Sequence, residues 1–136
     1  MQGTYPGVGV AEGGGAAQNS SGSSIAMGVA ITVAAGLMTL AANDGTAPNS
    51  VVTGITTEIV PDGKIGSYAF KAGQTVQFKA GAAVALGDKL MPETGGSGKW
   101  IKVTTAQGYF LRSIHETTLA DGEYGSAVIE PGDYKA

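Results

Sequence analysis

The sequence predicts an all-β protein, a small barrel or sandwich, from three observations. Charged residues make up only 14% of the 136 residues, and 23 residues are glycine, a composition unlike that of a helical chain. Short runs rich in Val, Ile, Thr and aromatic residues are separated by turns that contain Gly or Asp-Gly. No window carries the sustained apolar stripe of an amphipathic helix.

The first segment of the chain differs in composition from the rest. Residues 1–24 are rich in Gly, Ser and Ala without core periodicity, so we expect an extended N-terminal arm. Within it, Tyr5, Pro6, Val8 and Val10 form an apolar alternation that is able to add as a strand to the sheet edge of another protein. The alternative is a floppy terminus without a partner. Residues 25–136 are expected to form a single β domain.

Residues 25–42, "IAMGVAITVAAGLMTLAA", are an uncharged run whose length approaches that of a membrane-spanning helix. No Lys or Arg precedes Lys64, and bulky and small residues alternate from Ile25 to Ala34, as in a strand with one packed face. We therefore predict a strand and no membrane partner. The predicted strands are 25–34, 51–60, 65–71, 75–79, 82–86, 99–105, 109–115 and 124–130.

Two segments repeat each other without a gap. "DGKIGSYAFKAG" (62–73) and "DGEYGSAVIEPG" (121–132) share Asp, Gly, Gly, Ser and Gly at the same positions. "VAAG" (33–36) and "VALG" (84–87) are a second correspondence. These matches predict an internal duplication with repeats at 25–73 and 82–132. The alternative is a chance recurrence of Asp-Gly turns, which are common in hairpins.

The chain lacks the residue patterns of catalysis. His115 is the one histidine and Glu116 follows it, but neighbouring side chains of a strand point to opposite faces. The chain has no cysteine, and its one arginine is Arg112. No phosphate loop, nucleophile elbow or metal-ligand spacing occurs. We predict that the protein is not an enzyme and has no cofactor or metal; the absence of a basic cluster argues against a nucleic-acid partner.

Aromatic side chains are the candidate anchors of an interface, since aromatic residues carry much of the energy of protein contacts. Trp100, Tyr109 and Tyr134 are the predicted subunit-interface residues. The alternative places them in the core of the barrel.

The second half of the chain resembles a known family. "AVALGDKLMPETGGSGKWIKVTT", "GYFLRSI" and "ADGEYGSAVIEPG", within residues 82–132, are similar to the decoration (cement) proteins of tailed-bacteriophage capsids. The matching positions are Gly87 and Asp88, Gly98 and Lys99, Lys102–Thr104, Gly108–Ile114, Gly122, and Val128 with Ile129.

The resemblance implies a tulip-like β subunit, usually a homotrimer. Such a subunit binds the major capsid protein on the outer capsid surface of the virion and stabilises the expanded head against the pressure of packaged DNA. The N-terminal arm of the family reaches onto the shell. By that resemblance, Tyr5, Pro6, Val8 and Val10 are capsid contacts.

Two other functions compete with this interpretation. "VALGDKL" (84–90) also fits the turn of a biotinyl or lipoyl carrier domain. A carrier needs a lysine in a tight hairpin between its two copies, and Lys64 in "DGKIG" and Lys71 in "FKAG" do not match that motif. A β-rich adhesin or binding module is the other alternative.

Overall fold

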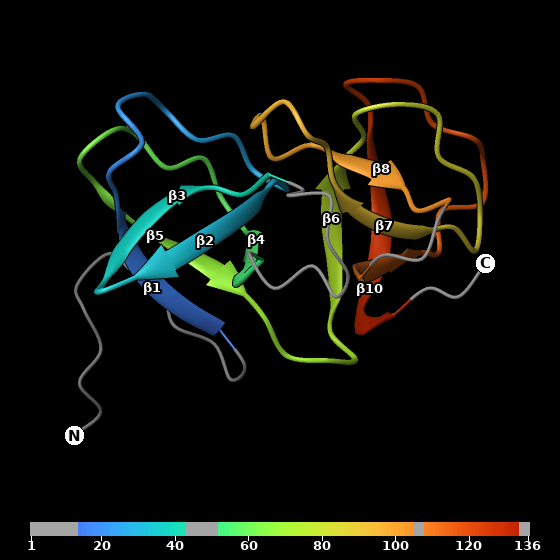
Figure 1. Cartoon of the computed structure of the whole chain (residues 1–136), viewed down its shortest axis with the longest axis horizontal. Helices are drawn as coiled ribbons and strands as arrows, with labels where there is room; N and C mark the ends of the chain where they lie inside the picture. The colour runs from blue at the N-terminus through green and yellow to red at the C-terminus, as the bar shows by residue number, and fades with distance from the viewer. Residues whose placement is uncertain (1–13, 43–51, 105–107, 134–136) are drawn as a thin grey trace.

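The computed structural model describes residues 14–42, 52–104 and 108–133, and these residues form an all-β fold, as predicted. The strands are arranged in two halves that lie side by side (Figure 1). Within the described residues there is no helix, and hence none that could cross a membrane.

The first half is a closed barrel and the second is a five-stranded sheet. The barrel has the order β1-β3-β2-β4-β5 and the sheet the order β6-β10-β9-β7-β8. The strands of the first half are β1 (Gly14–Asn19), β2 (Ala30–Ala34), β3 (Leu37–Leu40), β4 (Gly54–Thr56) and β5 (Ile65–Ala69). Those of the second half are β6 (Thr75–Lys79), β7 (Lys89–Pro92), β8 (Trp100–Lys102), β9 (Gly108–Ser113) and β10 (Tyr124–Asp133).

The two halves have the same strand connectivity. The first strand of each half runs antiparallel to its last strand, since β1 pairs with β5 and β6 pairs with β10. In both halves the second strand pairs with the third and the fourth, and the fourth pairs with the fifth. The repeated Asp-Gly segments occupy the same place in both halves, in the turn before the last strand and along that strand.

The hydrogen bonds show which residues correspond. Ile25 and Val60 exchange two backbone bonds in the first half, and Val84 and Leu119 do so in the second. The predicted match of "VAAG" (33–36) with "VALG" (84–87) is therefore wrong. Residues 25–28 ("IAMG") are the counterpart of 84–87 ("VALG") and share Ala and Gly with it. Residues 33–36 instead lie at the turn between β2 and β3.

The predicted strands agree with the structure to different extents. The strand at 75–79 is confirmed, and those at 65–71, 99–105, 109–115 and 124–130 overlap β5, β8, β9 and β10. Among the described residues of 25–34 and 51–60, strand occurs at 30–34 and 54–56, with one bridge between Ile25 and Val60. The segment 82–86 has a single bridge at Val84. A positive φ at Gly28 turns the chain within the first of these. Of its alternate bulky residues, Ile25, Val29 and Ile31 are buried, whereas Met27 and Val33 are partly exposed.

The predicted arm at 1–24 is too long, because residues 14–24 belong to the barrel. β1 pairs with both β3 and β5. Its small residues are required by packing: a Cβ at Gly15 would lie 2.5 Å from the ring of Tyr68. Asn19 is buried, and its side chain bonds the carbonyls of Ser23 and Val60, which fastens the following loop. Composition alone does not distinguish such a strand from a linker.

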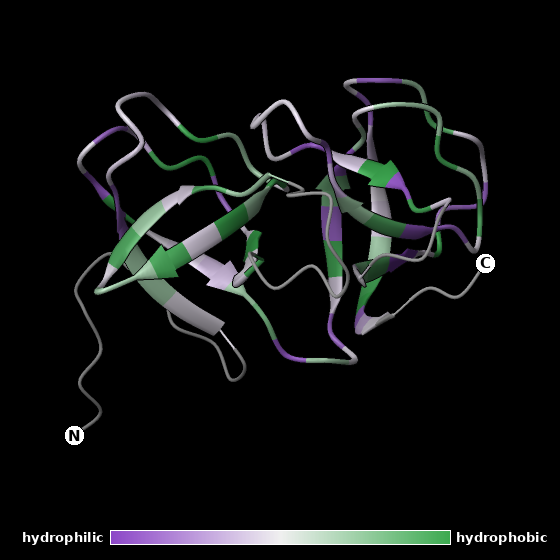
Figure 2. Cartoon of the chain, in the orientation of Figure 1, coloured by the Kyte–Doolittle hydropathy of each residue, from purple (hydrophilic) through white to green (hydrophobic). Residues whose placement is uncertain are grey.

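Two clusters of buried side chains form the core. One lies within the first barrel and contains Ala17, Ile25, Val29, Ile31, Met38 and Val60. The larger cluster joins the halves, since it combines Ala30, Ala41, Ile55 and Ala69 with buried residues of the second half such as Phe78, Leu90 and Trp100. Hydrophobic and hydrophilic residues alternate along β6 (Figure 2), as expected for strands with one buried face.

The repeated glycine of each last strand is explained by packing. A Cβ at Gly66 would lie 2.2 Å from Cγ2 of Val60, and a Cβ at Gly125 would lie 2.3 Å from Cδ1 of Leu119. Val60 and Leu119 are corresponding core residues. Glycine is required at both positions because a side chain would clash with the core, and not because of its conformational freedom.

We predict that Gly66→Ala lowers the free energy of unfolding by about 1–3 kcal/mol, because the new methyl group overpacks the core against Val60. The measurement is chemical denaturation. Gly95→Ala is the matched control, since its Cβ would meet only Glu93 Oε1 at 3.5 Å. If the clash is the cause, adding Val60→Ala should restore part of the loss, and a double mutant with simply additive losses would contradict it.

Candidate functional site: the junction and the outer faces

The backbone of the first half is inserted between two strands of the second. In the first half the amide of Gln18 donates to the carbonyl of Gly36 and helps to close the barrel. The corresponding groups of the second half are the amide of Lys79 and the carbonyl of Gly98. They instead bond the carbonyl of Gly28 at 2.9 Å and the amide of Ala30 at 2.8 Å. Residues 28–30 thus bridge the gap between β6 and β8.

Glycines permit this close approach. A Cβ at Gly28 would lie 3.0 Å from the carbonyl oxygen of Gln77, and one at Gly98 would lie 2.9 Å from that of Ala30. Both glycines have positive φ angles, +78° and +76°, which L side chains rarely adopt. The junction therefore depends on two glycines that no local sequence pattern distinguishes from ordinary turn glycines.

Trp100 seals the junction. Its Nε1 donates to the carbonyl of Gly28 at 3.0 Å, and its ring stacks on Phe110 with a centroid distance of 6.0 Å. The exposed fraction of Trp100 is 0%. The prediction that Trp100 lies at a subunit interface is therefore wrong. Trp100 lies at an internal interface between the two halves of one chain, because its indole packs against the inserted residues 28–30.

Corresponding outer faces of the two halves differ in polarity and exposure. In the first half Ala30 pairs with Ile55, and both are fully buried in the core cluster that joins the halves. In the second half the corresponding pair is Lys89 and Arg112, whose side chains are 28% and 38% exposed. The apolar copy of the face is covered within the chain, whereas the charged copy is accessible.

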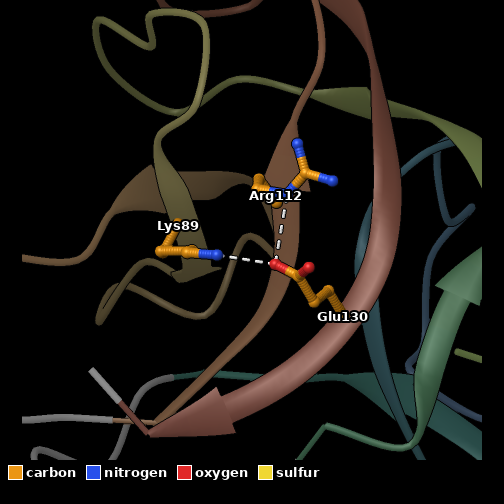
Figure 3. Close-up of polar contacts among 3 residues, drawn as sticks. All are labelled: Lys89, Arg112 and Glu130. Carbon is orange, nitrogen blue, oxygen red and sulfur yellow. Dashed lines mark hydrogen bonds and ion pairs between the residues drawn. The ribbon is translucent and has the colours of Figure 1, made fainter. Parts of the chain in front are cut away.

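Glu130 on β10 joins the two cations of this charged face (Figure 3). Its Oε2 accepts from Lys89 Nζ at 2.6 Å and from Arg112 Nε at 3.2 Å. The hydrogen bond from Lys89, with the positive charges of both partners, holds the pKa of Glu130 below its usual range, although burial acts in the opposite direction. Lys89 Nζ also lies 5.0 Å from the ring centroid of Tyr109.

Two apolar side chains are exposed close together on the barrel. Leu37 and Ile65 flank Gln18 on neighbouring strands, and they are 44% and 52% exposed. A shallow hollow beside them is lined by Ala16, Ala17, Gln18, Gly36 and Ile65. We call Leu37, Ile65 and this hollow the barrel patch. No sequence pattern marks this patch, because both residues occur in ordinary strand patterns.

The remaining predicted site residues lie apart. Tyr109 is partly buried under Lys89, and its role at a subunit interface stays a prediction. Tyr5, Pro6, Val8, Val10 and Tyr134 lie outside the described residues. Within the described ranges, no group of three acidic, His or Cys side chains is arranged to hold a metal ion. His115 and Glu116 line an open hollow with Ile114, Thr117 and Ser126.

The comparisons with known proteins bear on the fold. No protein-family model matches the chain, and no curated protein matches it in sequence. Among solved structures, the N base of the head fiber protein gp8.5 of bacteriophage phi29 is similar, with a TM-score of 0.64. The match covers 90% of this chain and 98% of that chain, at 16% sequence identity. At this identity the likeness is one of fold.

We predict that Trp100→Phe lowers the free energy of unfolding by about 1–3 kcal/mol, because it leaves the buried Gly28 carbonyl with one donor fewer and creates a small void. Tyr124→Phe is the control, since it removes an exposed hydroxyl group and keeps the ring beside Lys79. Both variants are compared by thermal and denaturant unfolding. A Trp100→Phe variant as stable as the wild type would contradict the role of the indole N–H.

We predict that Glu130→Gln lowers stability at neutral pH by at most about 1 kcal/mol, as for an exposed ion pair. Because the folded-state pKa of Glu130 is depressed, its contribution is present above the unfolded pKa of about 4.3 and is lost as the pH falls through the folded pKa. The difference in Tm should therefore shrink below pH ~4. Glu116→Gln, at an exposed site without a described ion pair, should show no such trend.

Proposed function

We propose that the protein is a structural subunit of a tailed-bacteriophage virion that binds the outer surface of the capsid and stabilises the expanded head. The observation that carries the proposal is the fold likeness to the phi29 head fiber N base, which extends over nearly the whole of both chains. The motifs of residues 82–132 that resemble those of capsid decoration proteins favour the same proposal.

The architecture suits such a role. The two halves share one core, so the subunit is able to transmit load between neighbouring shell proteins as a single body. The barrel patch and the charged face are two chemically different surfaces on the two halves. Many copies, each bridging several shell proteins, multiply modest contact energies through avidity. Preferential binding to the expanded lattice stabilises that state by linkage.

We propose the barrel patch as the shell contact of the described residues, with the N-terminal segment that contains Tyr5, Pro6, Val8 and Val10 as a second contact. Leu37 and Ile65 lose apolar exposed area on binding, which is favourable by about 25 cal/mol per Å². Self-association as a homotrimer remains part of the proposal.

The test is co-sedimentation with expanded, empty shells of the major capsid protein from the same genome. We expect saturable pelleting of the full chain, a lower affinity for a chain that begins at Gly14, and at least a tenfold loss (about 1.4 kcal/mol) for Leu37→Ser/Ile65→Ser. A start at Gly14 keeps β1 complete, so the barrel is preserved.

Leu86→Ser is the matched control, since Leu86 is also exposed but lies on the second half. Equal losses for this variant and for the Leu37/Ile65 variant would contradict the assignment of the barrel patch. A folded full chain that never pellets with expanded shells would contradict the proposed function itself.

A further inference from the structure

A groove beside β6, between the two halves, has an uncharged lining that is rich in hydroxyl groups. One part of the groove has a volume of about 310 Å³ and an adjoining part has about 150 Å³, which is the size range of small-molecule sites. No described residue that lines either part is charged. The polar side chains of the lining are hydroxyls and carboxamides, among them those of Thr57, Ser67, Tyr68, Thr75 and Gln77.

A chain of hydrogen bonds fixes the direction of two of these hydroxyl groups. Ser67 Oγ lies 2.8 Å from Glu58 Oε2, and because a carboxylate only accepts, Ser67 donates its one hydroxyl hydrogen there. The same carboxylate oxygen accepts the backbone amide of Ser67 at 2.9 Å. Thr57 Oγ1 lies 2.6 Å from Ser67 Oγ, so Thr57 is the donor of that bond. Thr57 Oγ1 is therefore left as an acceptor at the groove.

The second half shows that the fold does not require this chain. The amide of Thr57 donates to the carbonyl of Ser67 at 3.2 Å, and the amide of Ile114 donates to that of Ser126 at 3.0 Å. Thr57 and Ile114 are therefore corresponding residues, as are Ser67 and Ser126. An apolar side chain occupies in the second half the position that carries the hydroxyl acceptor in the first. The hydroxyl group of Thr57 is thus not explained by folding alone.

The rest of the lining supplies an aromatic ring and further polar groups. The half-buried ring of Tyr68 has a fixed place, because a Cβ at Gly15 would lie 2.5 Å from its Cζ and one at Gly54 would lie 2.8 Å from its Cδ2. Thr75 and Gln77 lie on one face of β6 and are exposed. Neither of these two side chains is hydrogen-bonded to another residue of the described ranges, so both remain available to a ligand.

We propose that the groove beside β6 binds a neutral saccharide. A sugar carries hydroxyl groups that both donate and accept, and C–H faces that pack on an aromatic ring. Thr57 Oγ1 accepts from a sugar hydroxyl, Thr75 and Gln77 donate and accept, and Tyr68 packs against an apolar face. An acidic sugar is disfavoured, because no described lining residue offers a positive charge and the carboxylate of Glu58 lies directly behind Ser67.

This inference goes beyond the proposed function and does not rest on it. The groove shares no lining residue with the barrel patch, so the two sites are separable by mutation. Sugar binding is measured on the isolated subunit without capsids. Its failure would leave the shell-binding test unaffected, and the failure of shell binding would leave sugar binding unaffected.

The test is an NMR titration of the isotope-labelled full-length protein with maltotriose, chitotriose and lactose. We expect saturable shifts of the amides of Thr57, Ser67 and Thr75 with at least one of these probes. Thr57→Val keeps the shape but removes the acceptor oxygen, and we expect it to weaken binding about tenfold. Thr117→Val is the matched control, since Thr117 is an exposed threonine of the hollow beside His115, and it should leave the affinity unchanged.

The charge preference is tested with glucose and glucuronate, and we expect glucose to bind more tightly. The unshifted amides of Ile25 and Val60, which bond each other in the barrel, report that the fold is intact in each variant.

Four results would overturn the proposal. The first is the absence of a saturable shift with all of the neutral sugars, and the second is equal affinity of the wild type and Thr57→Val. The third is tighter binding of glucuronate than of glucose, which would assign the groove to anions. The fourth is a shift of the same amides by an uncharged peptide and by none of the sugars, which would assign the groove to a protein partner.

Discussion

The carbonyl of Gly28 is the interaction on which the rest of the structure depends. It accepts the backbone amide of Lys79 and the indole N–H of Trp100, and so ties the first half to two strands of the second. Without the inserted residues 28–30, β6 and β8 would meet only at the Ala80–Trp100 bridge, and the second sheet would expose a long gap. The insertion joins the barrel and the five-stranded sheet into one body with a shared core.

The two halves share one backbone arrangement but present different outer faces. Corresponding hydrogen bonds recur through both halves, and Gly66 and Gly125 are retained because each faces a bulky core residue. The outer face differs: Ala30 and Ile55 are apolar and covered, whereas Lys89 and Arg112 are charged and exposed. The charges keep the second half from presenting another apolar face of the kind that the first half buries.

The surfaces that remain open are therefore specific ones. The barrel patch presents two exposed apolar side chains beside Gln18, the face around Glu130 is an exposed ion-pair cluster, and no described residue that lines the groove beside β6 is charged. The first offers apolar burial and the second offers charge pairing.

The sequence by itself determined the fold class, the register of the Asp-Gly segments and the confirmed strand at 75–79, because turn glycines and alternating burial are local properties. Only the tertiary structure decided the fate of the Gly-rich residues 14–24, which are ordered by Tyr68 and Val60, both distant in sequence. The same holds for Trp100, whose burial depends on a segment more than seventy residues away. Contacts of that range leave no periodic trace in a single chain, since the partner, and not the pattern around the residue, determines whether it is buried.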